Sequence, residues 1–145
     1  MGQPQRSEAD LRELLDSEKD AHNTLTTWTR AYLPDGTLLS ASLMFSVECH
    51  GENLFVRAEW KGAKDQQIFI KQSVKSSGNL ARICMTRCHG GIAHWHFLEG
   101  FNGIPDTTVS IANPPDVDES AMDELLMHFV ESQKITNFNH PGVLL

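Results

Sequence analysis

The chain has 145 residues, with 12 Lys and Arg against 19 Asp and Glu, and a formal net charge of -7. This length suffices for one domain with a core that needs no disulfide or metal, so we expect a single domain over 1–145. The charge argues against a protein that coats nucleic acid unspecifically, and no stretch approaches the roughly 18 apolar residues of a membrane helix.

The N-terminal stretch "MGQPQRSEADLRELL" lacks the apolar region of a secretory signal peptide. The chain also has three cysteines, an odd number that does not suggest a disulfide framework. These two features predict a reduced, cytoplasmic setting without a membrane partner.

The first predicted element is an amphipathic helix. In "SEAD", Ser7 supplies a capping side chain and Asp10 supplies a carboxylate three residues later, close to a capping box. An apolar stripe follows, formed by Leu11, Leu14 and Leu15. We expect this helix to begin at Ser7 and to end near Asn23.

Segments with period-two alternation come next and are separated by turn residues such as "PDG" at 34–36. This pattern is typical of antiparallel strands. In chain order, strands are expected at 24–33, 37–49, 53–60, 66–75, 80–88, 94–100 and, more weakly, 107–112.

The last predicted element is a second helix capped by Asp118. Its apolar residues follow the helical spacing i, i+3, i+4, i+7 and i+8: Met122, Leu125, Leu126, Phe129 and Val130. The tail after it is expected to be extended. Together the elements predict an α+β fold, an antiparallel meander of six or seven strands flanked by an N-terminal and a C-terminal helix.

Charge is distributed unevenly along the chain. Residues 53–100 carry seven Lys and Arg against three Asp and Glu, whereas both flanking segments are acidic. One explanation is intramolecular, with acidic helices lying over a basic sheet. The other is functional, with a basic sheet face that binds phosphate.

The segment "CHGGIAHWHF" at 88–97 holds three of the seven histidines. A zinc site shared by Cys84 and Cys88 is disfavoured, because residues four apart on a strand are separated by about 13 Å while thiolates on one zinc lie within about 4 Å of each other. A two-residue turn at Gly90-Gly91 would place residue 87 opposite 94 and residue 85 opposite 96.

That register predicts one polar face and one core face. The polar face carries Arg87, His89, His94 and His96, and the core face carries Cys84, Cys88, Ala93, Trp95 and Phe97. The cysteines and the histidines are then on opposite sides of the sheet.

Histidines and an arginine on one face favour metal-free phosphodiester chemistry. His94 and His96 are the candidate general acid and base, since an unperturbed histidine has a pKa of about 6.5, and Arg87 is the candidate phosphate clamp. Candidate substrate-binding residues are His89, Lys71, Lys75 and Arg82. No cofactor is required. Two alternatives remain: a metal site formed by His89, His94 and His96, or a solvent-facing strand without activity.

The stretch "ARICMTRCHGGIAHWHFLEGF", followed by an acidic helix, resembles a family of small prokaryotic and phage proteins. In that family a lone histidine precedes a His-x-His-aromatic strand that ends in Glu-Gly. On this match His89 is the lone histidine, His94 and His96 are the pair, and Glu99-Gly100 is the dipeptide. The chain departs from the family in its shorter loop after His89.

The family is distantly similar to TumE-type toxins of toxin–antitoxin pairs, which implies RNA as the substrate and an antitoxin as the partner. The leading hypothesis is therefore a toxin-like ribonuclease or related phosphoesterase. The rival is a non-enzymatic phage or immunity-related protein that binds a protein partner through acidic helices, with Asp123 and Glu124 as test positions. A metal-dependent enzyme is the third hypothesis, and homodimerisation remains open.

Overall fold

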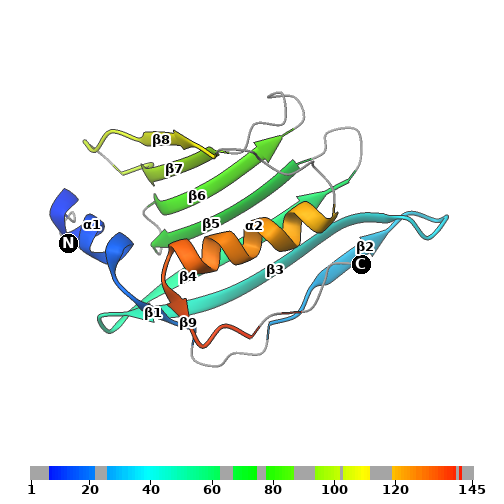
Figure 1. Cartoon of the computed structure of the whole chain (residues 1–145), viewed down its shortest axis with the longest axis horizontal. Coiled ribbons are helices and arrows are strands. Elements are labelled where there is room, and N and C mark those ends of the chain that lie inside the picture. Colours follow the sequence, from blue (N-terminus) through cyan, green and yellow to red (C-terminus); the bar gives the residue numbers. More distant parts are fainter. Residues whose placement is uncertain are drawn as a thin grey trace, which may run out of the picture.

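A computed structural model of the chain describes residues 7–21, 26–62, 67–74, 78–86, 94–101, 103–111, 119–139 and 141. Over these residues the protein is an open, mostly antiparallel sheet with two helices (Figure 1). The helices are α1 (Glu8–Asp16) and α2 (Glu119–Ser132). The strands are β1 (Lys19–Asp20), β2 (Thr29–Tyr32), β3 (Leu38–Cys49), β4 (Glu52–Lys61), β5 (Gln67–Val74), β6 (Gly78–Thr86), β7 (His94–Glu99), β8 (Thr107–Ser110) and β9 (Ile135–Thr136).

The strand order is β8-β7-β6-β5-β4-β3-β1-β9, and β2 pairs with β3 off this path. The predicted α+β class is confirmed, and β3 to β8 form the expected antiparallel meander. The sheet of the described residues has nine strands rather than six or seven. Among the strands that the sequence did not reveal are β1 and β9, which have two residues each and are therefore too short to show an alternation.

One sheet face carries the core. The predicted apolar stripe of α2 is confirmed, because all five of its residues are buried. This stripe packs on alternate residues of the central strands, such as Val56 on β4 and Ile70 on β5. Trp95 on β7 stacks on Phe129 of α2 with ring centroids 5.4 Å apart. We call this the helix face, since α2 lies across it (Figure 1).

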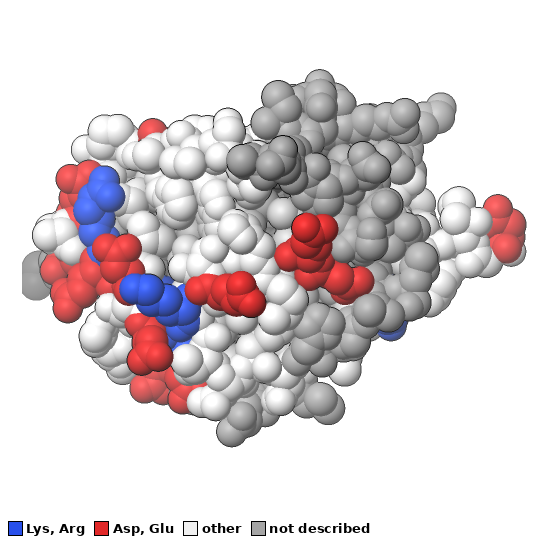
Figure 2. Space-filling view, viewed as in Figure 1, with Lys and Arg blue, Asp and Glu red and all other residues white. Residues whose placement is uncertain are grey.

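The opposite side of the sheet is the open face, defined by one residue on each of β3 to β7: Met44, Arg57, Lys71, Arg82 and His96. These residues alternate with buried neighbours such as Ile70 and Ile83 and are themselves partly or fully exposed. Figure 2 shows the helix face, where acidic side chains lie along α2 and around α1.

Three cations of the sheet lie on the face that the helices do not cover. The helices do lie over the sheet, but Arg57, Lys71 and Arg82 are on the open face and thus on the other side. The intramolecular explanation of the charge pattern is wrong for these three cations. No helix among the described residues combines the length and the apolar character needed to cross a membrane.

Helix α1 begins as expected and ends earlier than expected. Ser7 is the N-cap, and its Oγ accepts a hydrogen bond of 3.1 Å from the backbone N–H of Asp10. The helix ends at Asp16 rather than near Asn23. Ser17 is extended, its hydroxyl donates to the carbonyl of Glu13, and Lys19 donates to the carbonyl of Leu15. Side chains thus satisfy the last carbonyls and end the helix.

Replacing Ser7 by alanine is expected to destabilise the protein by about 1 kcal/mol, because the N–H of Asp10 loses its capping acceptor. Ser7→Asp keeps an acceptor at the cap and should unfold like the wild type. Urea unfolding of the three proteins measures the difference. An alanine variant as stable as the wild type would show that this cap contributes nothing.

Candidate polar site on the open face

The register between β6 and β7 differs from the predicted one. Cys84 pairs with His94 and Arg82 pairs with His96, whereas a turn at Gly90-Gly91 would have paired residues 87 and 85 with them. The observed register pairs Ile83 with Trp95 on the helix face, and both residues are buried. Burial of these two large apolar side chains under α2 outweighs the preference for a two-residue turn.

The shift is an odd number of residues, so it exchanges the two faces of β6. His94 and His96 lie on the open face as predicted, but their partners on β6 are the even-numbered residues. The predicted register, which paired His94 with residue 87, is therefore wrong, since the observed backbone register sets Cys84 opposite His94. Trp95 does lie in the core, as predicted.

Only part of the predicted site lies within the described residues. Arg87, His89 and Lys75 lie outside them, as do Cys88 and Ala93, so their predicted places stay untested. The described members of the predicted set are His94, His96, Arg82 and Lys71, and the last three follow one another across three neighbouring strands.

Two backbone irregularities bring a carboxylate into this site. Gln72 pairs with Ala81 but Ser73 pairs with Asn79, so Leu80 is an extra residue in β6. On the neighbouring strand Leu98 has a φ of 57°, a left-handed conformation that is unfavourable for a leucine. Both leucines are buried.

Each irregularity reverses the alternation of its strand. Asn79 directly precedes Leu80 and Glu99 directly follows Leu98. Both lie on the open face, where Asn79 donates a hydrogen bond to Glu99. Without the left-handed Leu98, the odd spacing from His96 would send Glu99 to the helix face. The strained backbone at Leu98 thus places the Glu99 carboxylate in the polar site.

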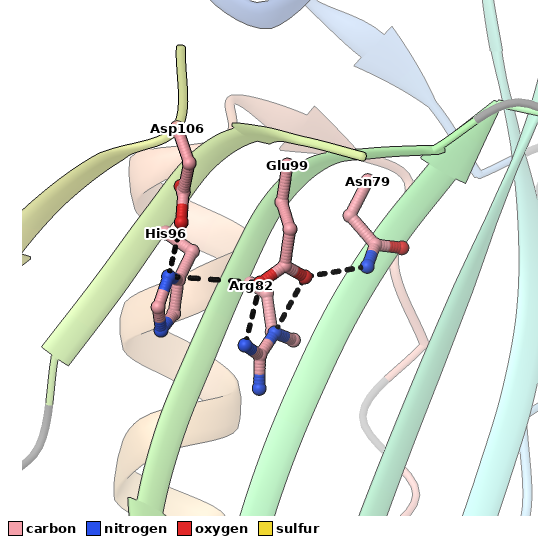
Figure 3. A network of polar contacts seen from close by, with 5 residues as sticks. All are labelled: Asn79, Arg82, His96, Glu99 and Asp106. Atoms are coloured by element: carbon pink, nitrogen blue, oxygen red, sulfur yellow. Dashed lines mark hydrogen bonds and ion pairs between the residues drawn. The ribbon is translucent and has the colours of Figure 1, made fainter. Parts of the chain in front are cut away.

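Glu99 is held by two side chains of β6 (Figure 3). Arg82 donates from Nε to Oε1 at 2.9 Å and from Nη2 to Oε2 at 2.7 Å, which is a two-point pair. Asn79 donates to Oε1 at 3.0 Å. The hydrogen bonds from Arg82 are the main cause that lowers the pKa of Glu99 from its ordinary 4.5.

His96 lies between two carboxylates (Figure 3). Its Nδ1 is 2.9 Å from Oδ2 of Asp106, which immediately precedes β8, and 3.6 Å from Oε2 of Glu99. An ionised carboxylate can only accept, so the hydrogen bond assigns the proton to Nδ1. In the neutral ring, Nε2 then carries the lone pair. This is the carboxylate–histidine arrangement of a general base.

His94 lies beside His96 on the same strand. The two ring centroids are 4.8 Å apart and the rings meet edge to face at 68°. Both side chains are partly exposed, so a ligand on the open face can reach them. A pair of neighbouring imidazoles can place one proton acceptor and one proton donor on the same substrate.

The sequence patterns missed Asn79, Glu99 and Asp106 as members of the site. Glu99 was matched only as part of a family dipeptide, because strict alternation hides a residue that follows a left-handed position. Asp106 lies in a connection whose path follows from the pairing of β7 with β8. The available signal was a carboxylate ten residues after His96, just before a strand expected at 107–112.

Protonation of Glu99 should weaken the fold in acid. Its pKa is lowered in the folded protein, so its contribution to stability is present above about pH 4.5 and is lost as the pH falls through the folded value. We expect acid to destabilise the wild type more steeply than Glu99→Gln, so that the two stabilities converge. Denaturant unfolding from about pH 6 to about pH 3 measures this. The exposed Glu131→Gln is the control, and parallel curves for wild type and Glu99→Gln would contradict the prediction.

Comparison of the chain with protein-family models, with curated proteins and with solved structures found no match. The resemblance of the histidine segment to small prokaryotic proteins therefore remains a prediction from the sequence, and the site has to be interpreted from its own geometry.

Proposed function

We propose that the open face cleaves phosphodiester bonds of RNA without a metal, with His96 as the general base and His94 as the general acid. The observation that carries the proposal is the 2.9 Å hydrogen bond from Nδ1 of His96 to Asp106, which leaves Nε2 as the proton acceptor. The partly exposed neighbouring ring of His94 supplies the second proton-transfer group that this chemistry needs.

The proposed reaction is a transfer to the neighbouring hydroxyl. His96 Nε2 takes the proton of the ribose 2′-hydroxyl as the 2′-oxygen attacks phosphorus. The bond from phosphorus to the 5′-oxygen breaks, and His94 gives its proton to that oxygen. The products are a 2′,3′-cyclic phosphate and a free 5′-hydroxyl. One proton is taken and one is given, so the protein returns to its starting charge after the two histidines exchange a proton with water.

Cations beside the histidines would stabilise the negative charge that develops on the phosphate oxygens. Arg82 pairs with His96 across the strands, and Lys71 pairs with Arg82 on the next strand. The guanidinium of Arg82 is fixed by Glu99, which keeps it in place rather than leaving it mobile. Arg87, the phosphate clamp predicted from the sequence, belongs to the same proposal.

A metal-dependent hydrolase is the second candidate, because ligand atoms of His96, Glu99 and Asp106 lie within 4.8 Å of one another. Of the three histidines predicted as metal ligands, this set contains His96, and His89 lies outside the described residues, so the predicted set stays untested. The arrangement fits a metal less well than it fits a proton-transfer site. Both oxygens of Glu99 already accept hydrogen bonds from the Arg82 guanidinium, whose positive charge would repel a bound cation.

The wider proposal is a toxin-like ribonuclease that acts in the cytoplasm and is restrained by a protein antitoxin. It is supported by the histidine motif and by the row of cations on the open face, Arg57, Lys71 and Arg82. If the protein instead acted by binding a protein partner through its acidic helices, charge reversal at the exposed Glu124 of α2 would abolish its effect on cell growth. We expect Glu124→Lys to behave like the wild type.

The test is incubation of the purified protein with single-stranded RNA in excess EDTA, with mass spectrometry of the fragment ends. We expect cleavage that leaves 2′,3′-cyclic phosphate and 5′-hydroxyl ends, and no cleavage at a position with a single 2′-deoxyribose. Cleavage that stops in EDTA and returns with a divalent metal would select the metal-dependent candidate. Cleavage at the 2′-deoxy position would exclude attack by the 2′-oxygen.

A further inference from the structure

A groove lies on the open face about two strands away from the histidines. Its volume is about 380 Å³ and it spans β3, β4 and β5. Two apolar side chains are exposed there, Met44 at 70% and Phe55 at 42%. The lining residues are Met44, Phe45, Ser46, Phe55, Val56, Arg57, Lys71 and Ser73.

Three cations beside this groove form a row across neighbouring strands, and their like charges repel one another. Arg57 pairs directly with Lys71, and Lys71 pairs directly with Arg82, so three like charges occupy neighbouring strands of one face. Like charges at directly opposed positions destabilise a sheet. An anion bound over the row would replace this repulsion by attraction, and a phosphate backbone is such an anion.

Acidic neighbours neutralise the two ends of the row better than its centre. Glu59 pairs with Arg57 at 3.1 Å, and Glu99 pairs with Arg82 at 2.7 Å. Within the part of the chain that the structure describes, Lys71 forms no ion pair. The central cation of the row is therefore the one best placed to bind an anion from solution.

We propose that this groove binds a nucleotide of single-stranded RNA, with a base stacked on Phe55 and a backbone phosphate on Lys71 and Arg57. Exposed aromatic side chains next to cations are the means by which sheet surfaces bind single strands. A duplex keeps its bases stacked inside, so a groove that offers one aromatic ring beside cations favours the single strand. This inference rests on the proposed function, since it names the substrate of the same open face.

The row connects the groove to the proposed cleavage site. Two strand spacings separate β5 from β7, which corresponds to about 10 Å. A strand of RNA that crosses the sheet along Arg57, Lys71 and Arg82 would reach His96 within a few nucleotides. The groove would then position the RNA upstream or downstream of the bond that the histidines cleave.

The experiment measures binding separately from cleavage. A fluorescein-labelled 2′-O-methyl RNA of about 12 nucleotides cannot undergo the proposed reaction, and its anisotropy reports binding to the wild-type protein. We expect Phe55→Ala to weaken binding about tenfold or more without changing the salt dependence. We expect Lys71→Gln to weaken binding and to reduce the slope of log affinity against log salt by about 0.7. Arg12→Gln on α1 is the control and should bind like the wild type.

A stability measurement distinguishes a binding lysine from a structural one. Removal of the central charge relieves the repulsion in the row, so Lys71→Gln without RNA should unfold at the same temperature as the wild type or at a higher one. A lower unfolding temperature would show that Lys71 supports the fold and would overturn its assignment to RNA.

Other outcomes separate the groove from the catalytic proposal. Unchanged binding in both variants, or equal affinity for duplex RNA, would overturn the groove even if the protein cleaves RNA. Binding that depends on Phe55 and Lys71 in a protein that cleaves no RNA would keep the groove and overturn the proposed function. A concentration-dependent dimer that Phe55→Ala abolishes would assign the groove to a second copy of the chain and overturn the RNA assignment.

Discussion

Replacement of Asp106 by asparagine is expected to slow RNA cleavage by about 100-fold or more while leaving RNA affinity unchanged. The carboxylate of Asp106 accepts the Nδ1 proton of His96 and so keeps the lone pair on Nε2. An asparagine amide can present its N–H₂ to Nδ1, which would favour the other tautomer and remove the base. Single-turnover cleavage and binding of 2′-O-methyl RNA measure the two quantities separately.

The control for this variant is Asp35→Asn. Asp35 is also exposed, precedes a strand and accepts a hydrogen bond, here from the backbone N–H of Thr37 at 2.8 Å. It lies in the turn between β2 and β3, away from the histidines, so its variant should cleave like the wild type. Equal cleavage rates for Asp106→Asn and the wild type would refute the assignment of His96 as a base oriented by Asp106.

The largest expected effect on stability is at Lys19. This lysine is only 1% exposed, and its ammonium group donates to the carbonyls of Leu15, Ser17 and Gln133 at 3.0, 2.9 and 3.0 Å. It thereby satisfies backbone carbonyl oxygens at the C-terminal ends of both helices. Lys19→Met keeps much of the volume but leaves these carbonyls without their donor, so we expect a loss of about 3 kcal/mol. The control is Lys134→Met, since among the described residues the exposed Nζ of Lys134 donates to a single carbonyl, that of Asp16.

The same lysine should make the free energy of unfolding depend on pH in the alkaline range. Burial lowers the pKa of Lys19 to about 8 from an ordinary 10.5. Between these values the unfolded chain holds the proton and the folded protein has released it, so a rise in pH through this window favours folding. The stability difference between wild type and Lys19→Met should therefore grow from about pH 7 to about pH 9.5.

A Cys49→Ala background is needed for this comparison. Burial raises the pKa of the Cys49 thiol, which has the opposite effect on stability in the same pH range. Chemical unfolding of both proteins in that background measures the effect of Lys19 alone. A difference that stays constant or shrinks with rising pH would show that the proton on Lys19 is not disfavoured by folding.

The elements that could be predicted from the sequence are those that repeat a pattern over several turns or pleats. The stripe of α2 and the alternation of β3 each extend over many residues, so a single exception does not hide them. The two-residue strands β1 and β9 follow from long-range pairing, and the end of α1 depends on Lys19, whose side chain bonds a carbonyl 114 residues away. Such contacts leave no local pattern.

The histidines of the site, with Lys71 and Arg82, could also be predicted, but the pairing across strands and the carboxylates could not. His94 and His96 share the open face because they are two apart on one strand, which requires only the period of a strand. Arg82 and Cys84 depend on the register, which the burial of Ile83 with Trp95 determines. The position of Glu99 depends on the left-handed Leu98, and that of its partner Asn79 depends on the extra residue Leu80. The positions of Arg87 and His89 lie outside the described residues and stay predictions.

Single-turnover cleavage of a single-stranded RNA by the wild-type protein and by His96→Gln, in excess EDTA, is the decisive test of His96 as a metal-free general base. We expect that the wild type cleaves, that Glu124→Lys cleaves at the same rate, and that His96→Gln is slower by about 100-fold or more with unchanged RNA affinity. A folded wild-type protein that leaves the RNA intact, or a His96→Gln variant that cleaves at the wild-type rate, would contradict it.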